Sequence, residues 1–412
     1  MNLSILSITK ETDDSDYKSL GYNIINEMET YSGKLAGICY MKDKYFDSYV
    51  SDVNKAKARF ERVAPTGHHS ISDHCFITVL FENIPKMTAM ILNSIGFYNT
   101  SEKSGRYTVM SSGNSEYSLN EELYHKWVEI FTKLIKEYDP GIEDKLVEKL
   151  SLENARYMIS VFATSTTMAY TTSLRMWSYI RQFCKRYIDV WDDEETSLDL
   201  VRTPFNKKVL ECIKDLYNSL TLANLYSDHI VDNKARNFQF LAKQTDYNIW
   251  DAAESYSDSY LIKYKSSFAS LAQEHRHRTL NYYMCFDGSQ AINFYIPKLI
   301  RETEYKQIWL EDLEKVKESY PIATLVDVVE TGTITDFLFK CDERLCGRVQ
   351  LETMENIIVN LLKFGRDWNK SPFMISQLQK HIRDGKIIMK CGNIRCEEPC
   401  YWGPIKAQNR LV

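Results

Sequence analysis

The spacing of apolar side chains predicts a mixture of strands and helices in the first half of the chain. The β-branched and aromatic stretch FITVLFE (76–82) predicts a strand, and PKMTAMILNSI (85–95) predicts a helix with proline in its first turn. Ser118 and Glu121 form a capping-box pattern before a further apolar-faced helix. Helical periodicity returns at 143–151, 165–186 and 205–226. The first half is therefore expected to be a helix-rich α+β region.

A similar order recurs after the polar stretch SDHIVDNKARN (227–237), which is the best candidate junction. A strand is predicted at SYLIKYK (259–265), a helix leads into AQEHRHR, and another helix is expected near 304–319. The apolar run LVDVVETGTI (325–334) then parallels MISVFATSTT (158–167) of the first half. Duplication and chance recurrence of helix order both explain this similarity.

Composition narrows the class of protein. The 412 residues are 44% hydrophobic and 26% charged, as in ordinary folded proteins. A net charge of −5 argues against broad affinity for nucleic acid or an anionic membrane. Apolar runs are too short to cross a bilayer, and no signal-peptide pattern precedes the ten cysteines, so a cytoplasmic protein with reduced thiols is expected. Glycine-rich dinucleotide and phosphate-loop motifs are absent.

Three short stretches carry candidate chemistry: GHHSISDH (67–74), SEKSGRY (101–107) and AQEHRHR (272–278). Gly105 would let backbone N–H groups approach a ligand, and the guanidinium of Arg106 suits phosphate. Taken singly, each stretch also fits a plain structural role, namely a polar strand entrance, a surface turn and a solvated helix face.

The C-terminal stretch KCGNIRCEEPCYWG (390–403) holds Cys391, Cys396 and Cys400. Zinc needs four ligands, and His381 is a distant fourth candidate. Reduced thiols are the preferred interpretation, so no metal site is expected.

Taken together, these stretches resemble the flavin-dependent thymidylate synthase family. His68, Ser70, Asp73 and His74 match its histidine-rich segment before a strand, and Glu102, Ser104, Gly105, Arg106 and Tyr107 match its last element. The arginine–histidine–arginine triplet that should stand between them is replaced by NSIGFY (93–98). Arg156 in ARYM and Arg175 in TSLRMW resemble its phosphate and flavin contacts.

The second half shows the complementary pattern. Gln273, Arg276, His277 and Arg278 match the triplet element in identity and spacing, whereas the following TLNYYMCFDG lacks the Glu, Ser and Arg of the last element. The stretch DERLCGRVQLE (342–352) resembles the family's pyrimidine segment and gives Arg344, whose first-half counterpart is Cys184.

The resemblance implies an architecture of two fused copies of the α+β flavin-dependent thymidylate synthase fold, an antiparallel sheet flanked by helices, which have lost complementary parts. The expected boundaries are 1–228 for the first copy, 229–366 for the second and 367–412 for a C-terminal helix and cysteine tail. Since the family forms its sites where several subunits meet, a homodimer that imitates a homotetramer is expected.

The function implied is transfer of a one-carbon unit from methylenetetrahydrofolate to C5 of a pyrimidine nucleotide, dUMP to dTMP, with FAD as cofactor and NADPH as reductant. Ser101, Ser173 and Arg348 depart from the family pattern. UMP or dCMP as acceptor, and hydroxymethyl transfer, therefore stay open. A catalytically inactive nucleotide- or flavin-binding assembly protein is the alternative from another class.

The resemblance also implies a role for each residue. The catalytic residues expected are Arg344, Arg276 and His68. The flavin side is expected to contain His68, Ser70, Asp73, Arg175, Arg276, His277 and Arg278. The nucleotide is expected to contact Glu102, Ser104, Gly105, Arg106, Arg156, Gln273, Arg276 and Arg344.

Overall fold

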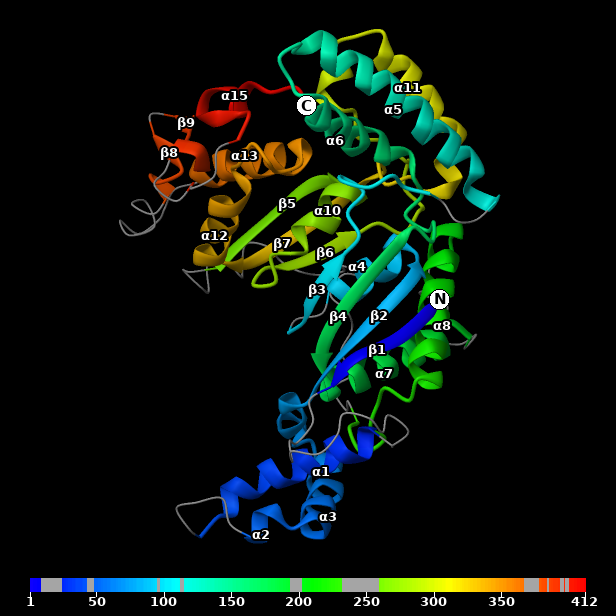
Figure 1. The fold of residues 1–412 in the computed structure, drawn as a ribbon, viewed down its shortest axis with the longest axis vertical. Helices are drawn as coiled ribbons and strands as arrows, with labels where there is room; N and C mark the ends of the chain where they lie inside the picture. The colour runs from blue at the N-terminus through cyan, green and yellow to red at the C-terminus, as the bar shows by residue number, and fades with distance from the viewer. Residues whose placement is uncertain are drawn as a thin grey trace. The chain divides into compact units, whose positions relative to one another are not determined.

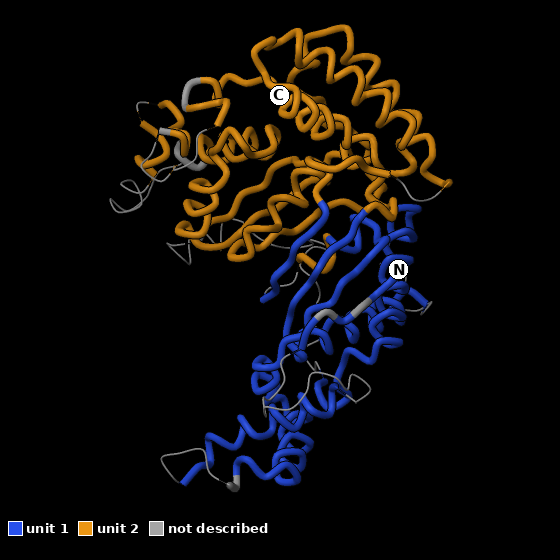
Figure 2. Tube along the Cα trace, viewed as in Figure 1, with its two compact units in different colours: residues 1–89, 97–103, 166–238 blue, residues 90–96, 104–165, 239–412 orange. Residues whose placement is uncertain are grey.

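The structure, a computed structural model, describes most of the chain as two compact units. The described residues are 1–8, 24–42, 48–94, 97–111, 115–192, 202–231, 259–366, 378–383, 385–392, 396 and 400–412. Figure 2 shows that each unit combines segments from distant parts of the sequence. Unit 1 contains 1–89, 97–103 and 166–238, and unit 2 contains 90–96, 104–165 and 239–412.

Unit 1 is built on a four-stranded antiparallel sheet (Figure 1). Its strands, in spatial order, are β1 (Asn2–Ile8), β2 (Phe76–Ile84), β4 (Thr166–Ser173) and β3 (Asn99–Glu102). The strand expected at 76–82 is thus confirmed. The helix expected over 165–186 is wrong in its first part, because the helix starts only at Leu174. The preceding TTMAYTTS is rich in threonine, suits a pleated surface, and pairs on both sides with β2 and β3.

The helices of unit 1 fall into two groups. Some lie against the sheet, and two of them, α1 (Ile24–Gly37) and α3 (Val53–Val63), pack against each other as a separate hairpin. The remaining helices are α2 (Ser48–Ser51), α7 (Leu174–Asp192) and α8 (Pro204–Leu222), with 3₁₀ turns η1 (Ile38–Tyr40), η2 (Ala64–Thr66) and η3 (His69–His74). The helix α4 (Lys86–Asn93) follows β2 and passes into unit 2 at Met90. Helices α1 and α3 approach so closely that a Cβ on Gly33 would lie 2.0 Å from the Ala56 carbonyl oxygen.

Unit 2 is built on a three-stranded antiparallel sheet. Its strands, in spatial order, are β5 (Ser259–Ser267), β7 (Leu325–Thr333) and β6 (Asn281–Cys285). The helices are α5 (Ser118–Tyr138), α6 (Asp144–Ala155), α10 (Phe268–Glu274), α11 (Tyr305–Lys315), α12 (Ile334–Arg344), α13 (Leu351–Arg366) and α15 (Gly403–Asn409). The short strands β8 (Ile382–Arg383) and β9 (Lys386–Ile387) pair in the C-terminal segment, and short 3₁₀ turns are η4 (Ser115–Tyr117), η5 (Arg156–Met158), η8 (Lys298–Ile300), η9 (Lys317–Ser319) and η10 (Lys390–Gly392).

The first half of the sequence contributes part of the unit 2 core. In Figure 1, α5 lies beside α11, and the rings of Trp127 and Trp309 meet edge to face with centroids 4.7 Å apart. The indole N–H of Trp127 donates to Asp312 at 3.0 Å. The capping box expected at the start of α5 is wrong. Ser118 is already helical, and the Glu121 carboxylate accepts from the Ser111 hydroxyl at 3.3 Å instead.

The two sheets share one topology. In unit 1 the order along the chain is β2, α4, β3, β4 and α7, and in unit 2 it is β5, α10, β6, β7 and α12. In both, the last strand of the set lies between the other two and is antiparallel to each. This is the arrangement that a duplication predicts, and the boundaries 1–228, 229–366 and 367–412 stay a prediction. Much of the expected junction, 232–237, and the residues just before the strand predicted at 259–265 lie outside the described residues.

None of the helices that the structure describes combines the length and apolar character needed to cross a membrane.

Candidate functional site

The SGR turn that follows β3 lies in unit 2 and is tightly packed. The Ser104 hydroxyl oxygen accepts from the backbone N–H of Arg106 at 3.3 Å, and the Ser104 carbonyl accepts from the N–H of Tyr107 at 3.1 Å. Gly105 is buried, and a Cβ there would lie 2.8 Å from the sulfur of Met110. Close packing therefore explains why position 105 is a glycine. The turn also fixes the backbone from which the Arg106 side chain extends.

Arg106 is held by α6. Its Nε donates to Glu153 Oε2 at 2.6 Å, and its Nη2 donates to the carbonyl oxygen of Arg348 at 2.5 Å. Burial alone would raise the pKa of Glu153, but the charges of Arg106 and Arg156 hold it at about 2. Glu153 is therefore an ionised, buried carboxylate between two arginines.

Arg156 joins the first half of the sequence to the second. Its Nη2 donates to the side-chain oxygen of Gln350, whose amide in turn donates to the Tyr157 hydroxyl. Tyr157 donates to Glu352 at 2.7 Å. Burial raises the pKa of Glu352 to about 7, although hydrogen bonds from Ser267 and Tyr157 oppose the shift. The two segments thus share one buried hydrogen-bond network.

The arginine–histidine–arginine triplet forms the turn between α10 and β6. Arg276 is half-buried, His277 is buried, and Arg278 is exposed. Nε2 of His277 accepts from Nε of Arg344 at 2.7 Å. Burial, with the charges of Arg344 and Lys340, lowers the pKa of His277 to about 2. The imidazole is therefore neutral, carries its hydrogen on Nδ1, and orients the guanidinium of Arg344.

Gln273, the remaining second-half residue expected to contact the nucleotide, lies at the end of α10. Its side-chain oxygen accepts from the Thr353 hydroxyl at 3.2 Å. Burial lowers the pKa of Arg344, and the charge of Arg106 is close enough to lower it further. Arg106, Arg156, Gln273, His277 and Arg344 are therefore brought together in one folded unit of one chain.

The other expected site residues lie in unit 1. His68 and Ser70 are exposed at η3. Asp73 pairs with Arg175 at 2.5 Å and accepts from the Ser173 hydroxyl at 2.8 Å. Glu102, at the end of β3, accepts from Lys86.

A buried ionic cluster, which the sequence does not predict, lies next to two of the expected site residues in unit 2. Lys340 Nζ lies 2.7 Å from Glu274 Oε2 and 2.7 Å from Glu330 Oε2, and all three side chains are fully buried. The Tyr264 hydroxyl donates to Glu330 at 2.7 Å. Glu274 adjoins Gln273, and Lys340 lies one turn before Arg344. The cluster therefore ties the triplet turn to the helix that carries Arg344.

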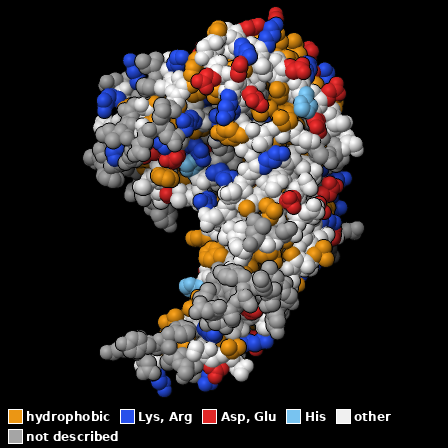
Figure 3. Space-filling model, viewed as in Figure 1, with side chains coloured by type: hydrophobic (Ala, Val, Ile, Leu, Met, Phe, Trp, Pro, Cys, Tyr) orange, Lys and Arg blue, Asp and Glu red, His pale blue; other side chains and the backbone are white. Residues whose placement is uncertain are grey.

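Charged side chains of both signs lie on the surface of unit 2 (Figure 3). On the face shown in Figure 3, Lys and Arg side chains gather around a hollow in the surface of this unit, with Asp and Glu side chains among them.

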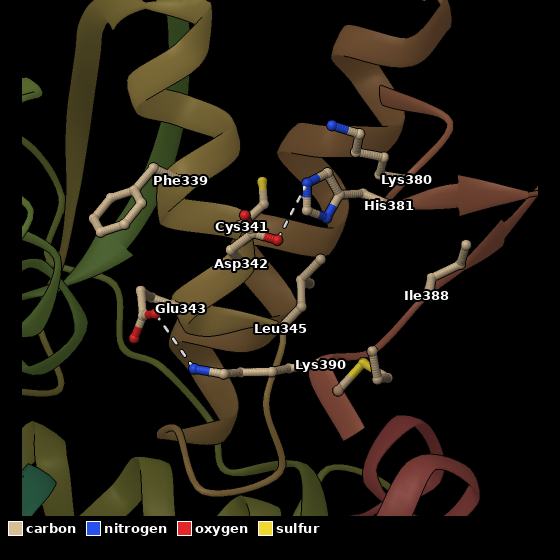
Figure 4. A pocket seen from close by; sticks show the side chains of 10 residues that line it. Phe339, Cys341, Asp342, Glu343, Leu345, Lys380, His381, Ile388 and Lys390 are labelled. Carbon is tan, nitrogen blue, oxygen red and sulfur yellow. Dashed lines mark hydrogen bonds and ion pairs between the residues drawn. The ribbon is translucent and has the colours of Figure 1, made fainter. Parts of the chain in front are cut away.

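A separate small pocket, of about 150 Å³, lies at the C-terminal segment (Figure 4). Its His381 is 3.7 Å from Asp342, and its Lys390 is 3.3 Å from Glu343. None of the expected site residues lines it. Cys391, Cys396 and Cys400 are half-buried and are not joined in disulfides. Across the part of the chain that the structure describes, no group of three or more His, Cys, Asp or Glu side chains could hold a metal ion.

One protein-family model matches part of the chain. Residues 23–187 match the family model described as thymidylate synthase complementing protein. The matched region includes Arg106 and Arg156 and ends before the triplet. No curated protein matches the chain.

The solved structures that are similar to this chain include two pyrimidine nucleotide enzymes. One is the flavin-dependent thymidylate synthase ThyX from Helicobacter pylori, complexed with FAD and dUMP, at 15% identity and a TM-score of 0.31, covering 56% of this chain and 100% of that one. The other is the UMP/dUMP methylase PolB from Streptomyces cacaoi, bound with 5-Br dUMP, at 12% identity and a TM-score of 0.29, covering 55% of this chain and 91% of that one.

Proposed function

We propose that this protein is a flavin-dependent methyltransferase that converts dUMP to dTMP. One observation carries the proposal. Arg106 and Arg156 from the first half of the sequence lie in the same folded unit as Gln273, His277 and Arg344 from the second half. The family of residues 23–187 and the ligands of the two similar structures support a pyrimidine nucleotide as substrate.

The nucleotide would be held at both ends by arginine. Arg106 and Arg156, with the Ser104 hydroxyl, would bind the phosphate, because guanidinium groups match phosphate oxygens in geometry and charge. Arg344 would face the pyrimidine carbonyls, where its charge stabilises the negative charge that develops when C5 becomes nucleophilic. The neutral His277 would fix the direction in which Arg344 points, and Gln273 would add a directional hydrogen bond.

The residues present fit FAD in chemical type. Arg276 and the exposed Arg278 offer cationic donors for its phosphates. Nε of Arg175 is a buried donor without a hydrogen-bond partner among the described residues. His68, Ser70 and Asp73, in unit 1, stay predicted flavin residues. When bound, FAD would supply the hydride that reduces the transferred carbon, with methylenetetrahydrofolate as carbon donor and NADPH as reductant.

The assembly follows from the proposed duplication. Two fused copies would let a homodimer replace a homotetramer, with one complete nucleotide site in each 48.2 kDa chain. The site residues that meet in unit 2 come from a single chain, which favours a site closed within that chain. A cytoplasmic location is proposed from the reduced cysteines, and neither nucleic acid nor a membrane is proposed as a partner.

Purified protein tests this proposal directly. A flavin absorbance spectrum and formation of dTMP from dUMP, with methylenetetrahydrofolate and NADPH, are expected. UMP and dCMP serve as competing acceptors, and the product mass separates methyl from hydroxymethyl transfer. A protein that binds flavin or nucleotide without turnover would be the inactive assembly protein instead. A protein that binds neither would contradict both functions.

A further inference from the structure

Three arginine side chains converge on three consecutive residues of unit 2. Arg106 donates to the carbonyl oxygen of Arg348 at 2.5 Å, Arg410 donates to the carbonyl oxygen of Val349, and Arg156 donates to the side chain of Gln350. Since neighbouring Cα atoms are about 3.8 Å apart, the three guanidinium groups occupy one small region.

Arg410 is fixed in this region although it comes from the far end of the sequence. It follows α15, is only 2% exposed, and donates through Nη1 to the Val412 carbonyl at 2.9 Å. The ring of Trp402 lies 5.4 Å from its guanidinium, and Trp402 itself packs on Gly347, where a Cβ would lie 2.8 Å from it. Its position is therefore set by packing.

Two N–H groups of these three arginines donate no hydrogen bond to a described residue. Nε of Arg156 and Nε of Arg410 are both buried, and neither has a hydrogen-bond partner in the part of the chain that the structure describes. A buried N–H without an acceptor costs about 1–3 kcal/mol. Two such donors in one region favour a ligand that brings acceptor oxygens.

Among the described side chains, this region also contains more positive than negative charge. Glu153 is the ionised carboxylate that acts on Arg106, Arg156 and Arg410 alike. Glu352 also acts on Arg156, but burial raises its pKa to about 7, so it is only partly ionised at neutral pH. Buried positive charge in excess of its counter-ions is unfavourable, and a bound dianion would offset it.

Resting on the proposed function, we propose that Arg410 is the third cation of the nucleotide-phosphate site, and that the site is built for a phosphate monoester dianion. Such a group carries a charge of roughly −1.5 to −2 at pH 7 and three acceptor oxygens. The C-terminal segment would then complete a site that the family-matched region, residues 23–187, supplies only in part.

Calorimetric titration with dUMP and with inorganic phosphate tests this inference. Arg410→Gln should weaken binding of both ligands by roughly tenfold or more, and Arg410→Lys should weaken it less. Arg301→Gln is the matched control, because Arg301 is half-buried in the same unit and pairs with Glu355 at 2.8 Å. It should leave both affinities unchanged.

The outcomes separate this inference from the proposed function. If wild-type protein does not bind dUMP, the proposed function fails. If wild-type protein binds dUMP and folded Arg410→Gln binds both ligands equally well, only the role of Arg410 fails. Loss of dUMP binding with phosphate binding unchanged would also overturn it.

If Arg410→Gln does not fold, hydrogen exchange on wild-type protein decides: dUMP should slow exchange over 403–410, and no change would overturn the inference.

Discussion

The central strand and following helix have the same arrangement in the two units but differ at two matched buried positions. Three residues before the end of its central strand, unit 1 has Tyr170 and unit 2 has Glu330. The seventh residue of the following helix is Ile180 in unit 1 and Lys340 in unit 2. All four side chains are fully buried. At these two matched positions the same topology therefore buries uncharged groups in unit 1 and charged groups in unit 2.

This difference shows that the ionic cluster is not needed to form the sheet and helix. Burying charges costs free energy, and well-packed apolar residues often replace a buried ion pair without loss of stability. The eleventh residue of the same helix is Cys184 in unit 1 and Arg344 in unit 2. The buried charged side chains thus occur in the unit that also contains Arg344, the arginine expected to face the pyrimidine. We interpret the cluster as the support that positions Arg344 and the triplet turn.

The largest effect is expected from breaking the cluster. Lys340→Met leaves Glu274 and Glu330 buried without their cation, which should lower the free energy of unfolding by about 3–5 kcal/mol. Ile180→Met, the matched change in unit 1, should cost less than about 1.5 kcal/mol. Urea denaturation of the two variants measures the contrast. Equal losses would contradict the distinction between the two interiors.

Replacing the whole cluster sharpens the interpretation. The triple variant Lys340→Met, Glu274→Gln and Glu330→Gln removes all three charges and should recover most of the lost stability. Its affinity for dUMP should stay below that of wild type, because α10 and α12 lose their ionic connection. Full recovery of both stability and dUMP binding would show that the cluster has no positioning role.

A smaller effect is expected at the proposed phosphate site. Arg106→Ala should weaken dUMP binding by roughly 10- to 150-fold, since a charge-assisted hydrogen bond contributes about 1.5–3 kcal/mol. Arg181→Ala in unit 1 is the control, because that arginine bonds to Thr221 at 3.1 Å and belongs to no proposed site. Unchanged dUMP affinity in both Arg106→Ala and Arg156→Ala would remove the first half of the sequence from the site.

The smallest effect concerns the neutral His277. Its folded pKa, about 2, lies below the ordinary value near 6.5, so stability is lost as pH falls below about 6.5, where the unfolded chain takes up a proton. Between pH 7.5 and 5.5 wild type should lose about 1 kcal/mol relative to His277→Gln. The raised pKa of Glu352 acts in the opposite direction, and comparison at equal pH cancels it. A pH-independent difference would mean that His277 is not held neutral.

The sequence predicts the local elements and the motif residues better than their environment. The strands at 76–82 and 259–265 and the position of Arg344 on a helix follow from short-range patterns. The sequence of Thr166–Ser173 is equally compatible with the start of a helix, and only its pairing with β2 and β3 decides that it is a strand. Glu153 and Lys340 resemble ordinary surface charges in sequence, because their burial depends on packing between segments distant along the chain. Arg410 has no local pattern that indicates a site.

The nucleotide site is proposed to close within one chain. Mixing Arg106→Ala protein with Arg344→Ala protein tests it, with differently tagged chains to prove that subunits exchange. Each variant retains what the other lacks, so a site shared between chains would recover dTMP formation in the mixture. We predict no turnover above the sum of the separate variants. Restored turnover after proven exchange would contradict the account.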